Sequence, residues 1–225
     1  MVNVCCVFYG DKYETIYVQN LYNMVKRHLT KPFKFHCFTD HTKIHKMVEG
    51  DIIFKPFPRH DFEGWWNKLQ LFNPETGLQG VNFYMDLDVV ILKNIDCFVE
   101  HGNEMDFGIT RDFGQPDNTY NSSVMKWNNA TMSDVIWKPY MNERVKHRKL
   151  QGDQNVITHY VQGKQILKPF PNEWTQSYKW FDRSKTRFHK KNWTFEKDPN
   201  AKICVFHGRP NPHESDQQWV KDNWK

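Results

Sequence analysis

The sequence predicts an α/β domain with a mostly parallel central sheet flanked by helices. Short apolar runs alternate with segments of helical periodicity, as strands and crossover helices do in such sheets. Polar residues directly follow several of the apolar runs, at the strand ends where parallel sheets bind ligands. The chain has 225 residues, of which 16% are aromatic, enough to build a large hydrophobic core. We therefore expect one domain over residues 1–225, with a ligand site beyond the strand ends.

The first half of the chain contains most of the expected elements. In order, they are a strand at 2–9, a helix at 13–29, strands at 33–39 and 51–57, a short helix at 65–72 and a central strand at 82–92. Valine, isoleucine and aromatic residues dominate the expected strands. Apolar residues recur at helical spacing between Tyr13 and Leu29, and Pro32 ends that helix. Trp65 and Trp66 are expected in the core.

The second half of the chain is less regular. We expect a strand at 106–110, a loop at 111–117, a segment at 120–125 that returns to the core, a helix that opens with Gly152 and Asp153, and a last strand at 203–206. The span 172–200 is polar, aromatic and basic, with too few aliphatic residues for a core of its own. We interpret this span as an excursion near the site.

Composition limits the classes of function and the compartment. Lysine and arginine number 31 against 26 acidic residues, a net charge of +5 that suits an anionic ligand. It does not approach the clustered basic surface of a nucleic-acid-binding protein, so no nucleic acid partner is expected. The 5 cysteines form no CxxC pair, which favours a reducing compartment. With no signal peptide and no apolar run of the ~20 residues that span a bilayer, we expect a soluble cytoplasmic protein.

Two carboxylates interrupt the central apolar run. Asp86 and Asp88 are two residues apart, and residues at that spacing point to the same face of an extended strand. Two buried anionic groups are costly unless a cation compensates them. A hard divalent cation with oxygen ligands would do so. The alternative is a strand end whose aspartates cap the next turn.

Further motifs accompany this pair. They are Trp66-Asn67-Lys68-Leu69; Tyr84-Met85-Asp86-Leu87-Asp88 followed by Asn94-Ile95-Asp96; Asp112 with Gly114, Pro116 and Asp117; Tyr120-Asn121-Ser122-Ser123-Val124; Gly152-Asp153-Gln154; and Phe206-His207-Gly208. In this order they resemble the motifs of GT-A type glycosyltransferases, and most closely those of the family-eight group that contains glycogenin. The resemblance covers roughly residues 2 to 212. Ser123 stands where the family has glycine, and the motif after His207 is compressed.

The resemblance implies a GT-A-like nucleotide-sugar-binding domain, with a nucleotide-binding half at 1–110 and a sugar- and acceptor-binding half at 111–225. It implies metal-dependent transfer of a sugar from a nucleotide diphosphate sugar, in particular a UDP-sugar, to an acceptor that is a glycan, a protein or a lipid. Retention of the anomeric configuration is also implied. Asp86, Asp88 and His207 would hold Mn²⁺ or Mg²⁺, and the imidazole favours Mn²⁺.

The resemblance also assigns the other candidate residues. The positions for the nucleotide sugar are Tyr9, Gly10, Tyr13, Asp40, Lys68, Asp86, Leu87, Gly208 and Arg209, and the predicted catalytic positions around the transferred sugar are Asp112, Asn121, Asp153 and Gln154.

Plainer alternatives stay open for three of these residues. Lys68 could be a solvated lysine, Asp153 a helix N-cap, and His207 a strand-end histidine bonded to backbone. Two other classes of protein also stay open. One is a nucleotide-sugar-binding protein without turnover, and the other is a metal-dependent nucleotidyltransferase or nuclease, whose paired carboxylates would act on phosphoryl groups.

Overall fold

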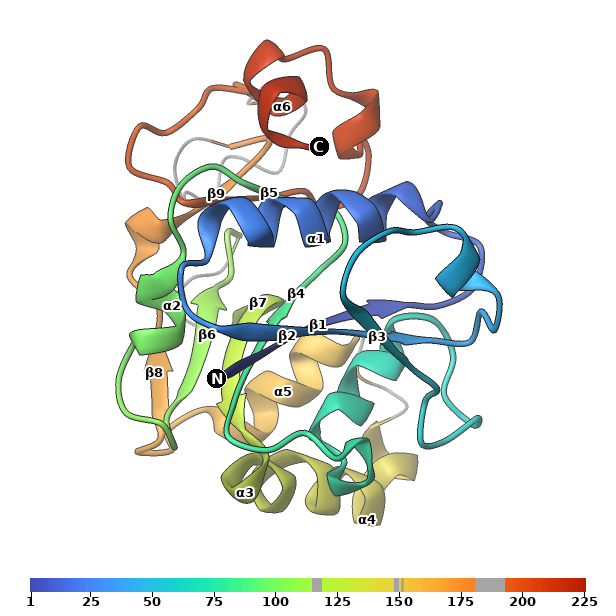
Figure 1. Cartoon of the computed structure of the whole chain (residues 1–225). Helices are drawn as coiled ribbons and strands as arrows, with labels where there is room; N and C mark the ends of the chain where they lie inside the picture. The colour runs from blue at the N-terminus through green and yellow to red at the C-terminus, as the bar shows by residue number, and fades with distance from the viewer. Residues whose placement is uncertain (115–118, 148–149, 151, 181–192) are drawn as a thin grey trace.

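A seven-stranded sheet forms the centre of the molecule (Figure 1). The computed structural model describes residues 1–114, 119–147, 150, 152–180 and 193–225, so Pro116, Asp117 and residues 181–192 lie outside the described part. The strands are β1 (Val2–Phe8), β2 (Phe33–Thr39), β3 (Ile52–Lys55), β4 (Val81–Met85), β6 (Phe107–Arg111), β7 (Tyr120–Asn128) and β8 (Leu167–Pro169). Their order is β3-β2-β1-β4-β7-β6-β8, and β7 runs against the direction that the others share. The predicted α/β class with a mostly parallel sheet is confirmed.

A second, smaller sheet lies beside α1 (Ile16–His28) (Figure 1). It contains β5 (Val89–Ile91), β10 (Ile203–Val205) and β9 (Thr175–Ser177), in the order β5-β10-β9. The single strand expected at 82–92 is therefore wrong, because β4 and β5 belong to different sheets. The Asp86 amide still donates to the Ser123 carbonyl at 2.9 Å, beside β7. After this bond the chain turns through Leu87 and Asp88 into the smaller sheet.

Helices cover both faces of the central sheet, and the alternation of side chains along its strands separates two cores. Val4 and Cys6 of β1 face the core that α1 and the smaller sheet close. Cys5, between them, faces the core beneath η2 (Gly64–Phe72), α4 (Lys138–His147) and α5 (Asp153–Val161). The remaining elements are η1 (Ile44–Lys46), η3 (Pro74–Thr76), α2 (Asp96–Glu100), α3 (Asn129–Met132), η4 (Ser133–Trp137), η5 (Asn172–Trp174), η8 (Pro212–Glu214) and α6 (Gln218–Asn223).

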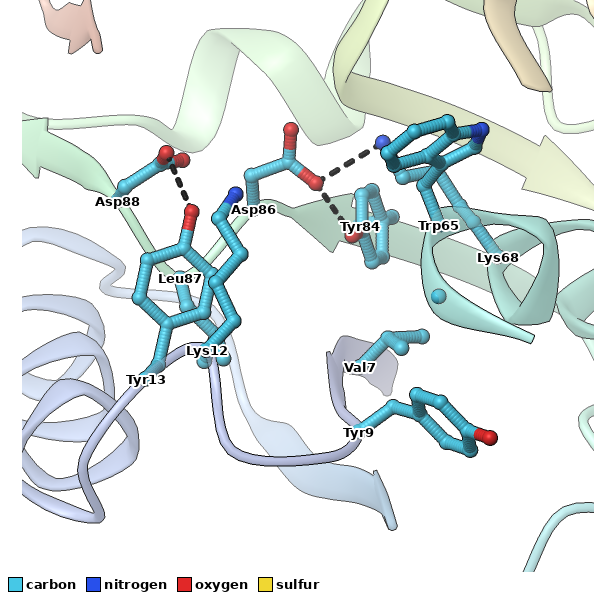
Figure 2. A pocket seen from close by; sticks show the side chains of 11 residues that line it. Val7, Tyr9, Lys12, Tyr13, Trp65, Lys68, Tyr84, Asp86, Leu87 and Asp88 are labelled. Carbon is cyan, nitrogen blue, oxygen red and sulfur yellow. Dashed lines mark hydrogen bonds and ion pairs between the residues drawn. The ribbon is translucent and has the colours of Figure 1, made fainter. Parts of the chain in front are cut away.

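The first helix begins later than predicted, at Ile16 instead of Tyr13. Gly10 adopts a φ of +61°, which favours glycine, and turns the chain sharply after β1. Tyr13 consequently lies in a loop, where its side chain reaches the end of the central sheet (Figure 2).

Two other expectations also change. The helix at 65–72 is a 3₁₀ helix that starts at Gly64. Part of the span 172–200 is more than an excursion, because β9 belongs to the smaller sheet and Tyr178 and Trp180 are buried. The central sheet draws strands from both predicted halves of the chain, and the division near residue 110 stays a prediction. Within the described part, all five cysteines are free and none of the helices combines the length and apolarity needed to cross a membrane.

Candidate functional site

A cavity of about 290 Å³ opens at the carboxyl ends of β1 and β4 (Figure 2). Its lining residues are Val7, Tyr9, Lys12, Tyr13, Gly64, Trp65, Lys68, Tyr84, Asp86, Leu87 and Asp88. Six of them are sequence-predicted site residues, namely Tyr9, Tyr13, Lys68, Asp86, Leu87 and Asp88. Lys12, Trp65 and Tyr84 contribute to the wall without having been assigned from the sequence.

Lys68 is a buried cation that joins two carboxylates. Its ammonium lies 2.9 Å from Asp86 Oδ1 and 3.1 Å from Asp153 Oδ2, and it donates to Ser122 Oγ at 3.1 Å. Burial acts to lower the pKa of Lys68, but the charges of Asp153 and Asp86 raise it above its usual value. Lys68 therefore stays protonated, and the alternative of a solvated surface lysine is wrong.

Asp86 is fully compensated by its surroundings. Its Oδ1 accepts a hydrogen bond from the Tyr84 hydroxyl as well as facing Lys68 (Figure 2). Burial acts to raise the pKa of Asp86, yet Lys68 and the hydrogen bonds from Tyr84, Lys68 and Ser123 hold it below its usual value. Asp86 is consequently an anion at neutral pH.

Asp88 is buried with much weaker compensation. Its side chain turns toward Tyr13, whose hydroxyl donates to Oδ2 at 2.7 Å (Figure 2). Burial and the nearby charge of Asp86 raise the pKa of Asp88 to about 6, against the Tyr13 hydrogen bond and the charges of Lys12 and Lys68. The two aspartates thus differ in partners, because the chain turns between β4 and β5 instead of continuing as one strand.

Asp153 occupies the first position of α5 instead of capping it. Gly152 is the N-cap, and no side chain caps the helix there. The Asp153 carboxylate accepts from Ser122 Oγ at 2.7 Å and faces Lys68. The N-cap alternative is therefore wrong, although a negative charge at this helix end is favoured by the helix dipole.

A second cavity of about 170 Å³ gathers four of the remaining candidates, Asp112, Asn121, Gln154 and His207. Its lining residues are Asp112, Phe113, Gly114, Asn121, Gln154, Trp180 and His207. Neighbours in sequence link the two cavities, since Ser122 and Asp153 contact Lys68 whereas Asn121 and Gln154 line the second cavity. Of the predicted sugar-side residues, Asp153 belongs to the ion cluster, and Asn121 and Gln154 directly adjoin its members in the chain.

His207 lies in the second cavity, in an aromatic setting. Its ring stacks on Phe113 with centroids 5.5 Å apart and lies 4.6 Å from the centroid of Trp180. Its Nε2 is 2.7 Å from Ser177 Oγ. In the described part of the chain, no three histidine, cysteine or acidic side chains are grouped closely enough to hold a metal ion. The role of His207 as a third metal ligand stays a prediction.

Asp86 and Asp88 nevertheless suit a divalent cation. Both offer hard carboxylate oxygens, and the buried charge of Asp88 has little compensation of its own. Hard cations of this kind bind through one or two carboxylates and take water and phosphate oxygens as their other ligands. The two aspartates fit such an ion on the chemistry of their donor atoms.

The other predicted residues do not line the first cavity, the one that contains Asp86 (the Asp86 cavity). Asp40 accepts from the Gly10 amide at 3.2 Å, and so shapes the turn after β1. The Arg209 side chain is 87% exposed and lies 3.8 Å from Glu214. A buried cation that the sequence did not assign, Lys179, donates to the His207 carbonyl at 2.7 Å and lies close to Gly208.

Comparison with known proteins adds the fold. No protein-family model and no curated protein matches the sequence. The glycosyltransferase GlyE of Streptococcus pneumoniae TIGR4 is similar, with a TM-score of 0.67 and 14% identity over 97% of this chain. The galactosyltransferase LgtC, solved in complex with donor and acceptor sugar analogs, has a TM-score of 0.65 and 14% identity over 99% of this chain. Mouse xyloside xylosyltransferase 1 has a TM-score of 0.60 and 14% identity over 92%.

These similarities establish the GT-A glycosyltransferase fold. The chain spans 63% of the GlyE chain, 96% of LgtC and 97% of the mouse enzyme. At such low identity they do not identify a narrower family, so membership in the glycogenin-like group stays a prediction.

We predict that Lys68→Met destabilises the protein by about 3 kcal/mol, because it leaves the buried carboxylate of Asp153 and the half-buried carboxylate of Asp86 without their cation. Adding Asp153→Asn should restore part of the loss, since one fewer buried charge is then unpaired. Urea unfolding of the single and double variants measures both effects. Lys164→Met is the matched control, because Lys164 is exposed and outside the site, and its loss should change stability by less than about 0.5 kcal/mol. A Lys68→Met protein as stable as wild type would contradict the buried ion cluster.

We also predict that Asp88→Asn stabilises the metal-free protein at pH 7.5, by about 1–3 kcal/mol from the raised pKa. The pKa of Asp88 rises from 3.8 to about 6 on folding, so the ionised carboxylate disfavours the folded state above pH 6. Protonation removes this penalty, and the advantage of the variant should shrink as the pH falls from 6 to 4. Unfolding in EDTA across this pH range tests the sign. An advantage that grows toward pH 4 would show that Asp88 is better compensated than its contacts indicate.

Proposed function

We propose that this protein is a metal-dependent glycosyltransferase that moves a sugar from a nucleotide diphosphate sugar, in particular a UDP-sugar, to an acceptor with retention of configuration. The observation that carries the proposal is the Asp86–Lys68–Asp153 cluster in a cavity at the strand ends of a GT-A fold. Nucleotides bind at the carboxyl ends of the strands in open α/β sheets. Carboxylates at those ends can hold the cation that a donor diphosphate needs. Membership in the family-eight group belongs to the same proposal.

The residues of the cavity take different tasks in this scheme. Asp86 and Asp88 hold the divalent cation, Mn²⁺ or Mg²⁺, with His207 as the proposed third ligand. That cation, when bound, acts as a Lewis acid that neutralises charge on the leaving phosphate. Lys68 keeps Asp86 ionised and fixes Asp153 beside it, so that the local charge is preorganised before the donor arrives. Tyr13 orients Asp88 by its hydrogen bond.

The second cavity supports the placement of the transferred sugar. Asp112, Asn121 and Gln154 line it with carboxylate and amide groups, which suit the hydroxyls of a pyranose. A carboxylate such as Asp153 near the sugar stabilises the positive charge of an oxocarbenium-like transition state. The proposed donor therefore runs from the Asp86 cavity toward the cavity of Asn121 and Gln154.

The transfer can be balanced without a protein base. The bond between the anomeric carbon and the phosphate oxygen breaks, and the nucleoside diphosphate leaves with the electron pair. An acceptor hydroxyl oxygen forms the new bond on the same face of the sugar. Its proton passes to the departing phosphate, which lies on that face.

The proposal is tested by incubating the protein with a panel of nucleotide sugars and Mn²⁺, and measuring free nucleoside diphosphate and free sugar 1-phosphate. We expect nucleoside diphosphate from one donor, and a fall in kcat of roughly 10²-fold, equivalent to ~2.7 kcal/mol, for Asp153→Asn. Asp134→Asn, which removes an exposed carboxylate, is the matched control and should keep wild-type turnover. Donor binding with neither product would indicate a binding protein, and release of sugar 1-phosphate, which leaves when the nucleotidyl group is transferred, would indicate a nucleotidyltransferase.

A further inference from the structure

Trp65 is an exposed aromatic residue at a place where the sequence predicts core. Its side chain is 61% exposed, whereas every residue from Asn67 to Phe72 on the same helix is buried. A single exposed hydrophobic residue is common on protein surfaces, so the informative feature of Trp65 is that its exposed indole also lines the Asp86 cavity. The expectation that Trp65 belongs to the core is wrong. Trp66 fits the same expectation better, because it is partly buried against the core under η2.

The geometry of η2 places Trp65 at the mouth of the Asp86 cavity. A 3₁₀ helix has three residues per turn, so residues i and i+3 lie on one face. Trp65 and Lys68 therefore share a face, with Lys68 buried beneath and Trp65 toward solvent (Figure 2). Gly64 and Trp65 both line the cavity. A Cβ added to Gly152 would lie 3.7 Å from the Trp65 indole nitrogen, so the ring also borders the start of α5.

The surroundings of the ring define what can stack on it. One indole face offers apolar surface, while Asp86, Lys68 and Asp153 offer charged hydrogen-bonding groups at its base. A pyranose matches both, because its C–H face is apolar and its edge carries hydroxyls. A nucleobase fits less well here, since the proposed nucleoside positions Tyr9 and Tyr13 belong to the segment after β1, which forms a wall of the cavity separate from η2 (Figure 2).

The position of Trp65 also indicates which of the two substrates, donor or acceptor, its ring contacts. In the proposed function, the transferred sugar extends from the Asp86 cavity toward Asp153 and Gln154 at the start of α5. The ring of Trp65 borders the same end of α5 at Gly152 and is exposed, so it is available to a second substrate beside the transferred sugar. We propose that Trp65 is the stacking platform for a sugar ring of the acceptor, and hence that the acceptor is a carbohydrate or glycoside. This inference rests on the proposed function and narrows its acceptor class.

The inference is tested on a printed array of diverse glycans, with the 225-residue chain, UDP and Mn²⁺. The wild type should bind a subset of the glycans. Trp65→Leu should weaken that binding by about tenfold, whereas Trp65→Phe should keep most of it, because it retains an aromatic face. UDP affinity, measured by calorimetry on the same preparations, should fall far less than glycan affinity in Trp65→Leu. Met105→Ala is the control for loss of exposed apolar surface, since Met105 is 41% exposed and directly precedes β6, at the amino ends of the parallel strands, away from the cavity at their carboxyl ends.

Each outcome has a distinct meaning. A wild type that binds UDP but no glycan, or a Trp65→Leu protein that binds glycans like wild type, overturns the inference and leaves the proposed function intact. An equal fall in glycan and UDP affinity in Trp65→Leu also overturns it, because Trp65 would then contact the nucleotide. A wild type that binds no UDP with Mn²⁺ rejects the proposed function instead.

Discussion

The ammonium of Lys68 is the constraint on which the candidate site depends. It is buried between Asp86 and Asp153, and Ser122 joins the same cluster. These four groups come from η2, the end of β4, β7 and the start of α5. A buried charge that loses its partner costs several kcal/mol, so the cluster fixes how these elements meet. The geometry of the site and the packing of the second core are therefore coupled.

The same cluster makes the two aspartates unequal. Asp86 has Lys68 and Tyr84 as partners, whereas Asp88 has the Tyr13 hydroxyl and a pKa raised to about 6. A protein that keeps a buried carboxylate with so little compensation sacrifices stability at that position. Perturbed groups of this kind concentrate at functional sites. In our account, a divalent cation shared with the donor diphosphate supplies the missing positive charge.

Sequence patterns predicted much of the fold but little of the local geometry. The α/β class and most strands could be predicted because short apolar runs must be buried, and the sheet is where they are buried. The turn at Leu87 was missed, because Val89 and Val90 continue the apolar run after Met85 and nothing in the pattern shows a change of sheet. The exposure of Trp65 was missed for a related reason, since an aromatic residue is expected to be buried. Lys12 could have been predicted as a site residue, because it is a basic residue that lies between the predicted positions Gly10 and Tyr13 in the segment after β1.

The central claim is that Asp86 and Asp88 bind the donor diphosphate through a divalent cation. Calorimetry with UDP, in Mn²⁺ and in EDTA, on wild type and Asp88→Asn, tests it most directly. Our account predicts tight binding by the wild type in Mn²⁺, weak binding in EDTA because the carboxylates repel the phosphates, and loss of the Mn²⁺ effect in Asp88→Asn. Equal UDP affinity of the wild type in EDTA and in Mn²⁺ would contradict it.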